Sequence, residues 1–428
     1  MSHNTKYFFI AGNPVSHSKS PQLFDAYARD AELPHRYIKA LCTKADDVEL
    51  LLRNGFSGGN ITAPLKEEIL SLGYPRSLTV DKLRAANTIF ELNGELMFEN
   101  TDGYGVIDAL LPVVGSFTGK KAVVTGIGGA GRAAFWALLQ LGCEVSILNR
   151  SMENALYWAE IFGCRAYGLY QPADSILNAD IIINTVPVVD SMIDHIQKHH
   201  IILDADYRNC PLKELAVTAG ATYISGTEWL MYQAVPAFTL FGNRVCGIDI
   251  LKESLQKEHL QPKKNIILVG MMMSGKTTVG QILAKKLEMK FTDTDTLIEQ
   301  MTGKTITEIF EQEGEHRFRH YENEVFRKCI DSENQVIATG GGLVLEAENR
   351  KGIHKKGIGV WLFTSAKELA SRSDSQSRPL LDTDNKEKRL TELLGRRFSD
   401  YIQSTELLIP TDDKTPEKIA ELIAGSLR

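Results

Sequence analysis

Two glycine-rich turns, each between a β-branched run and a helical stretch, constrain the fold of this chain more than any other feature. The first turn, GIGGAG at 126–131, follows Lys121–Thr125, and the second, GMMMSGKT at 270–277, follows Asn265–Val269. Strand, glycine turn and helix in this order are typical of a nucleotide-binding unit, because the turn exposes helix N-terminal N–H groups to a phosphate. The remaining chain alternates short β-branched runs with amphipathic stretches, which predicts an α/β protein with parallel sheets.

Length and charge limit the class of protein. The 428 residues suffice for about three domains, and no apolar run approaches the ~20 residues that span a bilayer. The net charge of −6 lies wholly before Pro262, with 22 Lys and Arg against 28 Asp and Glu, and the rest is balanced at 26 against 26. Neither part has the basic excess of a nucleic-acid-binding protein. Six scattered cysteines without a CxxC pair predict reduced thiols. We therefore expect a cytoplasmic protein without nucleic-acid or membrane partners.

A short histidine-containing segment could suggest a metal site. His195 and His199 stand four residues apart, and His200 follows, but only Asp190 and Asp194 are nearby as further ligands. A structural metal site needs about four ligands of suitable spacing. We therefore predict a solvated helix end here rather than a metal site.

The first glycine turn also indicates which cofactor it accepts. GIGGAG satisfies the dinucleotide pattern GxGxxG, and the next expected strand, Glu144–Leu148, ends in Asn149, Arg150 and Ser151. A site for NAD usually ends this strand with a carboxylate that accepts from the ribose 2′-hydroxyl. An arginine at this point suits a 2′-phosphate instead, since its fork of donors matches phosphate oxygens. The sequence therefore predicts NADP(H).

Hydroxyl and amide side chains gather in four runs before this unit. They are GNPVSHSKSP at 12–21, GNITAPLK at 59–66, ANT at 86–88 and NTDG at 100–103, placed near the ends of expected strands. Each run alone is typical of a turn or helix cap. Together they are polar with little charge, which suits a small polyhydroxylated substrate.

With the GIGGAG turn, these runs resemble shikimate dehydrogenase over residues from about 6 to about 259. The resemblance implies NADPH-dependent reduction of 3-dehydroshikimate to shikimate. It assigns substrate binding to Ser18, Ser20, Asn60, Thr62, Lys66, Asn87, Asp102, Tyr207 and Gln233. The residues expected to bind the cofactor are Gly126, Gly128, Gly129, Ala130, Gly131, Asn149, Arg150, Ser151 and Gly226.

Lys66 and Asp102 match the catalytic pair of that family. Hydride transfer to a ketone leaves a developing alkoxide, and a lysine held by a carboxylate can stabilise that charge and donate the proton.

Two departures from the family pattern bear on the cofactor. The segment 185–189, TVPVV, lacks the hydroxyls and glycine usual after the strand Asp180–Asn184, and Asn154 replaces a second arginine. NADP preference with some tolerance of NAD is expected.

The second glycine turn satisfies GxxxxGK[ST], the phosphate-binding loop (P-loop) of many nucleotide enzymes. Its expected ATP-binding residues are Gly270, Ser274, Gly275, Lys276, Thr277 and Thr278. Lys276 would reach the β- and γ-phosphates, and Thr277 would hold Mg²⁺. Asp293 and Asp295 end the next expected strand, and glycines 340–342 follow Val336–Ala338.

These motifs resemble shikimate kinase from Asn265 to about Leu427. The resemblance assigns shikimate binding to Asp295, Arg319, Gly341 and Arg397. It places Asp293 near Mg²⁺, Arg378 in a mobile lid that neutralises charge, and Arg372 near the adenine. Asp295 could also accept the proton of the attacking hydroxyl.

The kinase resemblance has two departures. Met273 stands where that family usually carries a glycine, and the lid between Arg372 and Arg378 is about one residue short.

Both resemblances name consecutive steps, so we predict a bifunctional enzyme that makes shikimate and then phosphorylates it. A helical pattern at Leu251–Leu260, followed by a proline and two lysines, separates the halves. The expected domains are a substrate domain (1–103, completed by 235–261), a Rossmann-like NADP domain (104–234), a linker (262–264) and a P-loop kinase domain with a parallel sheet flanked by helices (265–428). Two alternatives stay open: the first half could be a quinate/shikimate dehydrogenase using NAD, or one half could be a non-catalytic binding module.

Overall fold

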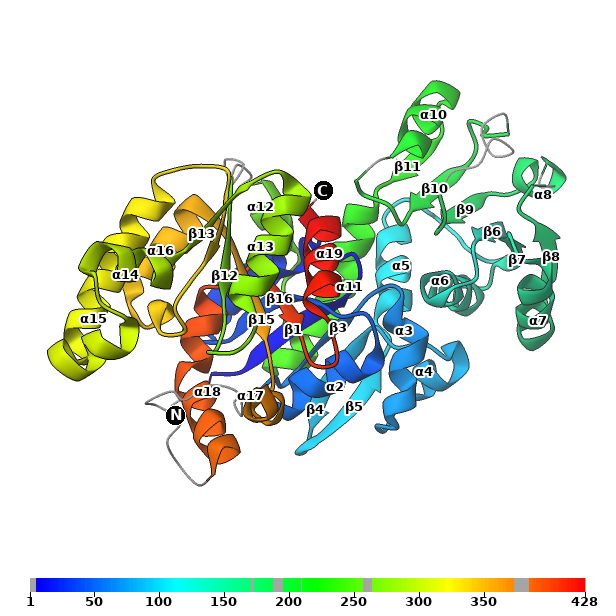
Figure 1. Ribbon diagram of the computed structural model, residues 1–428. Helices are drawn as coiled ribbons and strands as arrows, with labels where there is room; N and C mark the ends of the chain where they lie inside the picture. Colours follow the sequence, from blue (N-terminus) through cyan, green and yellow to red (C-terminus); the bar gives the residue numbers. More distant parts are fainter. Residues whose placement is uncertain are drawn as a thin grey trace.

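The fold is that of a computed structural model, which describes residues 5–170, 173–187, 195–208, 210–256, 264–372 and 385–427. The strands of these segments form two sheets, one of ten strands and one of six, with helices packed on them (Figure 1). The predicted α/β class with parallel sheets is confirmed. Residues 262–263 of the expected linker and Arg378 of the expected lid lie outside the described residues.

The six-stranded sheet is the unit built around the first glycine turn. It is parallel, in the order β11-β10-β9-β6-β7-β8. The strands are β6 (Lys121–Thr125), β7 (Glu144–Asn149), β8 (Arg165–Gly168), β9 (Ile181–Asn184), β10 (Ile201–Asp204) and β11 (Thr222–Ile224). Successive side chains of a strand point to opposite faces, so Ile183 and Ile182 lie in different core layers.

Helices cover both layers of this sheet. The helices α6 (Gly129–Gln140) and α7 (Met152–Phe162) pack in the layer of Ile183. The helices α8 (Ala173–Leu177) and α10 (Pro211–Ala219) pack in the layer of Ile182. A parallel sheet buried on both faces explains why its strands read as continuous apolar runs.

The ten-stranded sheet joins segments from the two ends of the chain. Its order is β13-β14-β12-β15-β16-β2-β1-β3-β4-β5. Its first half in the sequence is β1 (Tyr7–Gly12), β2 (Arg36–Leu41), β3 (Gly58–Ile61), β4 (Thr88–Leu92) and β5 (Glu95–Glu99). The other half is β12 (Asn265–Val269), β13 (Lys290–Asp293), β14 (Gln335–Ala338), β15 (Gly357–Phe363) and β16 (Leu407–Pro410). Only the β3–β4 and β4–β5 pairs among these are antiparallel.

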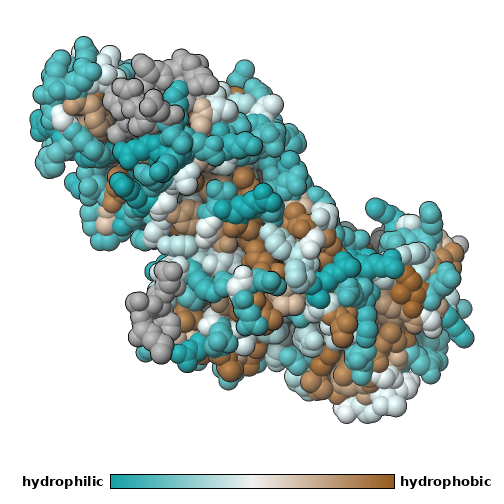
Figure 2. All heavy atoms as spheres, turned by 90° about the horizontal axis from the view of Figure 1, so that it is seen from below, coloured by the Kyte–Doolittle hydropathy of each residue, from teal (hydrophilic) through white to brown (hydrophobic). Residues whose placement is uncertain are grey.

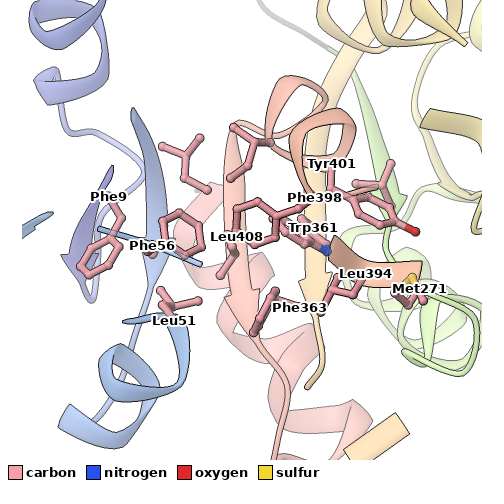
Figure 3. Packing of buried hydrophobic residues seen from close by; sticks show 14 of the residues in the cluster. Phe9, Leu51, Phe56, Met271, Trp361, Phe363, Leu394, Phe398, Tyr401 and Leu408 are labelled. Atoms are coloured by element: carbon pink, nitrogen blue, oxygen red, sulfur yellow. The ribbon is translucent and has the colours of Figure 1, made fainter. Parts of the chain in front are cut away.

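The two halves of this sheet meet where β16 pairs with β2. Leu407 lies opposite Lys39 and Leu408 opposite Ala40, in parallel register. We call this pair of strands, with the side chains packed across it, the seam. Figure 3 shows Leu408 between Phe9 and Phe56 of the N-terminal part and Trp361 of the C-terminal part. The expected domain boundaries stay predictions, and the continuous sheet is a feature that they did not include.

Each core layer of the ten-stranded sheet runs across the seam. One layer holds Phe9, Ile267 and Leu408, and the other holds Phe8 and Leu407. Helices that contribute to the first layer are α2 (Ala45–Arg53), α14 (Thr294–Thr302), α15 (Ile306–Ile330), α16 (Ala347–Lys356), α17 (Ala366–Arg372) and α18 (Lys386–Gln403). Helices in the second are α1 (Ser20–Asp30), α11 (Gly226–Gly242), α12 (Ile248–Gln256), α13 (Lys276–Leu287) and α19 (Pro416–Leu427).

Shorter helical segments lie in the chain between β3 and β6. They are α3 (Leu65–Glu68), the 3₁₀ turn Ile69–Leu72, α4 (Leu78–Leu83) and α5 (Asp102–Leu110). Helix α5 packs on α6 of the six-stranded unit and on α11. This packing places the first glycine turn beside the polar runs.

Local sequence patterns located several of these elements. The strands expected at Tyr7–Ala11, Arg36–Ala40 and Thr88–Leu92 correspond to β1, β2 and β4. The helix expected at Leu251–Leu260 overlaps α12, and residues 257–260 of it lie outside the described residues. The predicted solvation of the segment His195–His200 is wrong for His200, whereas residues 197–199 are exposed. His200 is fully buried in a turn, its Nδ1 accepts from Gln197 N at 2.9 Å, and burial lowers its pKa to about 4.

The surface shows where polar residues gather. Figure 2 shows the face seen from below, and hydrophilic residues dominate the end of the molecule that α14 and α15 occupy. Within the described residues, no helix is both long and apolar enough to cross a membrane.

A buried ion pair gives a test of the seam. Lys414, just after β16, bonds to Asp47 of α2, and their side chains are only 8% and 3% exposed. Breaking a buried pair leaves an uncompensated charge, so Lys414→Ala should lower the free energy of unfolding by about 3 kcal/mol. The exposed Lys418–Glu421 pair supplies the control, since Lys418→Ala should cost less than about 1 kcal/mol.

The measurement is urea unfolding of the full chain, followed by circular dichroism. Equal effects of the two substitutions would contradict a stabilising pair across the seam.

Two candidate active sites

A cavity of about 850 Å³ lies between the N-terminal half of the ten-stranded sheet and the six-stranded unit. The predicted substrate-binding residues all line it: Ser18, Ser20, Asn60, Thr62, Lys66, Asn87, Asp102, Tyr207 and Gln233. The predicted cofactor residues Gly126, Gly128, Gly129, Ala130, Gly131, Asn149 and Gly226 line it too. Arg150 and Ser151 do not: Arg150 is exposed at the end of β7, and Ser151 caps α7 by accepting from Asn154 N at 3.3 Å.

Lys66 and Asp102 meet in this cavity. Lys66 Nζ donates to Asp102 Oδ2 at 2.5 Å, and both side chains are largely buried. The second carboxylate oxygen of Asp102 accepts from Asn87 Nδ2 at 3.0 Å, and its backbone oxygen accepts from Trp229 Nε1 at 3.0 Å. Asp102 is therefore fixed from three sides, and it fixes the ammonium of Lys66 in turn. A positioned ammonium group of this kind can stabilise a developing oxyanion.

Amide side chains form a hydrogen-bonded group beside the pair. Asn87 Nδ2 also lies within hydrogen-bonding distance of Gln233 Oε1 and Thr101 Oγ1, at 3.1 and 2.9 Å. Asn60 accepts from the hydroxyl of Tyr37 at 2.8 Å and donates to the backbone oxygen of Asn87 at 3.2 Å. Burial raises the pKa of Tyr37 well above its usual value, so this hydroxyl stays a donor. Such a preorganised group suits ring hydroxyls of a small substrate.

Two serines beside Tyr37 and Asn60 suit an anion. Ser18 and Ser20 are buried, and Ser18 Oγ donates to Ser20 Oγ at 3.2 Å at the start of α1. Helix N-terminal N–H groups favour a carboxylate here. Sequence reasoning missed His17, whose ring lies 6.2 Å from that of Tyr207. Burial chiefly, and then the charges of Arg208 and Lys39, lower the pKa of His17, which keeps it neutral.

The turn 126–131 is shaped for a dinucleotide. A β-carbon at Gly131 would lie 2.0 Å from the backbone oxygen of Gly126, so only glycine fits this close approach. The helix α6 starts after Gly128 without a side-chain cap, which leaves its first N–H groups available to a pyrophosphate. Val186 belongs to the segment after β9 whose sequence differs from the usual dehydrogenase pattern. It packs on this turn, since a β-carbon at Gly126 would lie 2.5 Å from Val186 Cγ1.

Sequence reasoning also missed a buried arginine beside the catalytic pair. Arg132 is 3% exposed, pairs with Glu67 at 2.7 Å, and lies over the ring of Trp158 at 4.5 Å. Burial lowers the pKa of Arg132, with Glu67 acting against that shift. Because Glu67 follows Lys66 in the chain, this contact ties the catalytic lysine to α6. An arginine directly after a glycine turn was the available signal, but its partner is remote in sequence.

The second site forms around the turn 270–277, at the carboxyl end of β12. Lys276 Nζ donates to the backbone oxygens of Gly270 and Met271 at 2.9 and 2.8 Å. The helix α13 begins at Lys276 without a side-chain cap, and the buried hydroxyl of Ser274 has no hydrogen-bond partner among the described residues. Unsatisfied donors at a loop and helix start fit the phosphates of a nucleotide. Thr278 is exposed at the start of the same helix.

Oxygen ligands for a divalent cation gather beside this loop. Thr277 Oγ1 donates to Asp293 Oδ2 at 2.7 Å, and Asp293 Oδ1 accepts from Asp295 N at 3.0 Å. Asp293 thus caps α14 and also accepts from the threonine. A hydroxyl and a carboxylate are ligands that Mg²⁺ prefers, so these residues fit that ion.

Glycines 340–342 bring the expected substrate residues of this site together. A β-carbon at Gly340 would lie 3.1 Å from Asp295 Oδ1, and one at Gly342 would lie 2.3 Å from Arg319 Nη1. The backbone oxygen of Gly341 accepts from Arg397 Nη1 at 3.2 Å. Asp295, Arg319 and Arg397 therefore surround the turn that contains Gly341, and the two guanidinium groups suit a carboxylate.

Glu322 is a member of this group that sequence reasoning missed. It is fully buried, and its Oε2 accepts from Arg319 Nη1 at 2.6 Å. Burial raises the pKa of Glu322 despite the attraction of Arg319. Burial alone would lower the pKa of Arg319, but Glu322 and Glu315 outweigh it and raise that pKa. Glu322 therefore orients the arginine, and its spacing three residues after Arg319 on a helix was the available signal.

Met273 and Arg372 meet at the outer side of the turn. Met273 has φ of +63°, a left-handed conformation in which glycine is the usual residue. Arg372 Nη1 donates to the backbone oxygen of Met273 at 3.3 Å, which places this arginine beside the loop, and its expected position near the adenine stays a prediction. The departure at Met273 is therefore a change of residue at a backbone position that still adopts positive φ.

Comparisons with known proteins agree with both sites. A family model for the shikimate dehydrogenase substrate binding domain matches residues 10–89, and one for shikimate kinase matches residues 272–428. A shikimate kinase of Thermodesulfovibrio yellowstonii is 44% identical over 161 residues, which cover 37% of this chain and 92% of that protein.

Solved structures give the corresponding result for the dehydrogenase. Shikimate dehydrogenase of Aquifex aeolicus superposes with a TM-score of 0.55 at 28% identity, covering 60% of this chain and 100% of that one. Shikimate 5-dehydrogenase of Thermus thermophilus, solved with NADP(H) and shikimate, gives 0.52 at 28% identity, covering 59% and 99%. The chain thus joins a shikimate dehydrogenase-like part to a part that belongs to the shikimate kinase family, and it is a bifunctional enzyme of the shikimate pathway.

Proposed function

We propose that the N-terminal part reduces 3-dehydroshikimate to shikimate with NADPH, and that the C-terminal part phosphorylates shikimate with Mg·ATP. The observation that carries the first activity is the Lys66–Asp102 contact inside a cavity that the dinucleotide turn also lines. The observation that supports the second is the gathering of Asp295, Arg319 and Arg397 around glycines 340–342, beside the phosphate-binding loop.

In the dehydrogenase, NADPH would supply the hydride to the ketone carbon. The chain's own task is to handle the charge that forms on the ketone oxygen. Lys66 Nζ, held by Asp102, stabilises the developing alkoxide and donates the proton to it. Ser18 and Ser20 bind the substrate carboxylate, while Asn60, Thr62, Asn87, Tyr207 and Gln233 contact the ring, so that the reacting carbon faces the turn 126–131.

In the kinase, ATP would supply the phosphoryl group and Mg²⁺ would offset its charge. Arg319 and Arg397 hold the shikimate carboxylate, and Asp295 orients the attacking hydroxyl and accepts its proton. Lys276 neutralises charge on the phosphates, as Arg378 would from the lid. Thr277 and Asp293 provide the oxygen ligands for the cation.

The proposal is tested first by removing one lysine at a time. Lys66→Ala should reduce kcat of the dehydrogenase by about 10²- to 10⁴-fold, because the proton donor is lost. Lys276→Ala should abolish phosphorylation, because the phosphates lose their neutralising charge. Each variant keeps the other activity and so serves as the other's control, in separate assays of NADPH oxidation and ADP release.

Loss of both activities in either folded variant would contradict two separate sites. A chain with one activity missing before substitution would instead favour the reading of that half as a binding module.

Cofactor preference is tested at Arg150. Arg150 is exposed directly after β7 and would pair with the 2′-phosphate, so Arg150→Ala should raise KM for NADP about tenfold, equivalent to about 1.4 kcal/mol. KM for NAD should change little, because NAD has no such phosphate. Initial rates with both cofactors, on shikimate and on quinate, measure this. A preference for NAD and quinate in the unmodified protein would favour the quinate/shikimate dehydrogenase alternative.

The left-handed residue of the phosphate-binding loop gives a further test. Met273→Val puts a β-branched residue at positive φ, which should lower the free energy of unfolding by about 1–2 kcal/mol and raise KM for ATP. Met273→Gly is the matched variant, since glycine adopts this φ without strain, and it should keep KM for ATP close to that of the unmodified protein. Thermal denaturation and ATP-dependent rates check both. If valine were tolerated as well as glycine, the loop would not require this backbone conformation.

A further inference from the structure

One helix of the kinase part contacts both its own active site and the core of the dehydrogenase part. The helix α18 carries Arg397 and Tyr401, which both donate to the backbone oxygen of Gly341, at 3.2 and 2.7 Å. Between them on the same helix is Phe398, which points across the seam toward Phe56 (Figure 3). The side chains that hold the expected substrate turn and the side chain that enters the dehydrogenase core are therefore neighbours on one rigid element.

The dehydrogenase part supplies the surface against which Phe398 packs. The ring centroid of Phe398 lies 5.2 Å from that of Tyr7 and 5.4 Å from that of Phe56, in edge-to-face geometry. Gly55 also touches it, since a β-carbon there would lie 3.4 Å from its ring. Aromatic pairs of this geometry add specific orientation to the burial of apolar area. The position of Phe398 is thus set from the dehydrogenase side.

The same ring continues into the kinase side. The ring centroids of Phe398 and Trp361 lie 5.5 Å apart. Trp361 in turn stacks on Tyr401, with 5.1 Å between the ring centroids and 19° between the ring planes. Trp361 and Tyr401 are essentially fully buried, and Phe398 is 7% exposed. Protein cores are close-packed, so a displacement of one such ring is passed to its neighbours. The contacts form an unbroken series from Phe56 to Gly341.

We infer that Phe56 of the dehydrogenase part is a positioning residue of the kinase site: it holds Phe398, and through α18 it keeps Arg397 and Tyr401 in place around Gly341. This inference rests on the proposed function, in which Arg397 binds the shikimate carboxylate. It goes beyond that function because it makes the dehydrogenase core a structural component of the second active site. The two activities are then joined by packing and not only by a tether.

The effect should be specific for one substrate of the kinase. Lys276 donates to the backbone oxygens of Gly270 and Met271, and Thr277 donates to Asp293, so these three hydrogen bonds of the phosphate-binding loop are made without α18. A small shift of α18 should therefore weaken shikimate binding and leave ATP binding largely unchanged. This separation gives a readout that a general loss of stability would not produce.

The test replaces Phe56 with leucine in the full chain. Phe56→Leu keeps an apolar side chain but removes the ring edge that meets Phe398, so KM for shikimate should rise by about 3- to 10-fold, with KM for ATP within about twofold. Phe98→Leu is the matched control. Phe98 is fully buried in the same core layer, but it lies on β5 at the far edge of the sheet and has its ring contact with Tyr74.

A third variant tests the role of the contact itself. Methionine fills irregular core space and makes favourable sulfur–aromatic contacts, so Phe56→Met should bring KM for shikimate back toward the unmodified value. The inference is overturned if Phe56→Leu leaves KM for shikimate unchanged, or if Phe98→Leu raises it equally. It is also overturned if both KM values rise together.

A failure of the proposed function can be told apart from a failure of the inference. If the unmodified protein did not phosphorylate shikimate, the proposed function would be wrong, and the inference would lose its basis. Normal kinetics of the unmodified protein, combined with an insensitive Phe56→Leu variant, would overturn the inference alone.

Discussion

The backbone pairing of β16 with β2 is the interaction on which the rest of the molecule depends. Without it, each half would end in an open parallel edge, and an exposed edge of apolar strands is a site of unwanted association. With it, Leu407 and Leu408 lie inside one sheet, and both core layers extend from Phe8 and Phe9 to Ile266 and Ile267. The pairing of β16 with β2 covers only two residue pairs, and side chains reinforce it, above all the buried ion pair of Lys414 and Asp47.

The two active sites use the same physical means for different chemistry. In each, a glycine turn follows a buried parallel strand and leaves helix N-terminal N–H groups without a capping side chain. In each, a buried carboxylate fixes a cation by direct contact: Asp102 holds Lys66, and Glu322 holds Arg319. Preorganised charges in a largely water-excluded site act more strongly than they would in solvent, which is why both pairs are buried.

Sequence patterns predicted what is local. Strand, turn and helix around residues 126 and 270 follow from periodicity and glycine placement, and the polar runs before residue 103 do come together in one cavity. The partners of Arg132 and the pairing of β2 with β16 were not predictable in this way, because each joins segments far apart in the chain. His200 was wrongly placed at the surface because a polar side chain can be buried when its ring stays neutral and hydrogen-bonded.

The strands from β12 through β15, β16 and β2 to β1 are all parallel, so the phosphate-binding loop after β12 and the serine-containing segment after β1 start along one edge of one sheet. Neighbouring strands are about 4.8 Å apart, which puts the ends of β12 and β1 about 19 Å from each other. Each step of a sheet also rotates by about 20–25°, and four steps amount to about 80–100°. The shared sheet therefore keeps the two catalytic centres within a few nanometres of each other. Its twist also turns the strand that precedes one centre away from the direction of the strand that precedes the other.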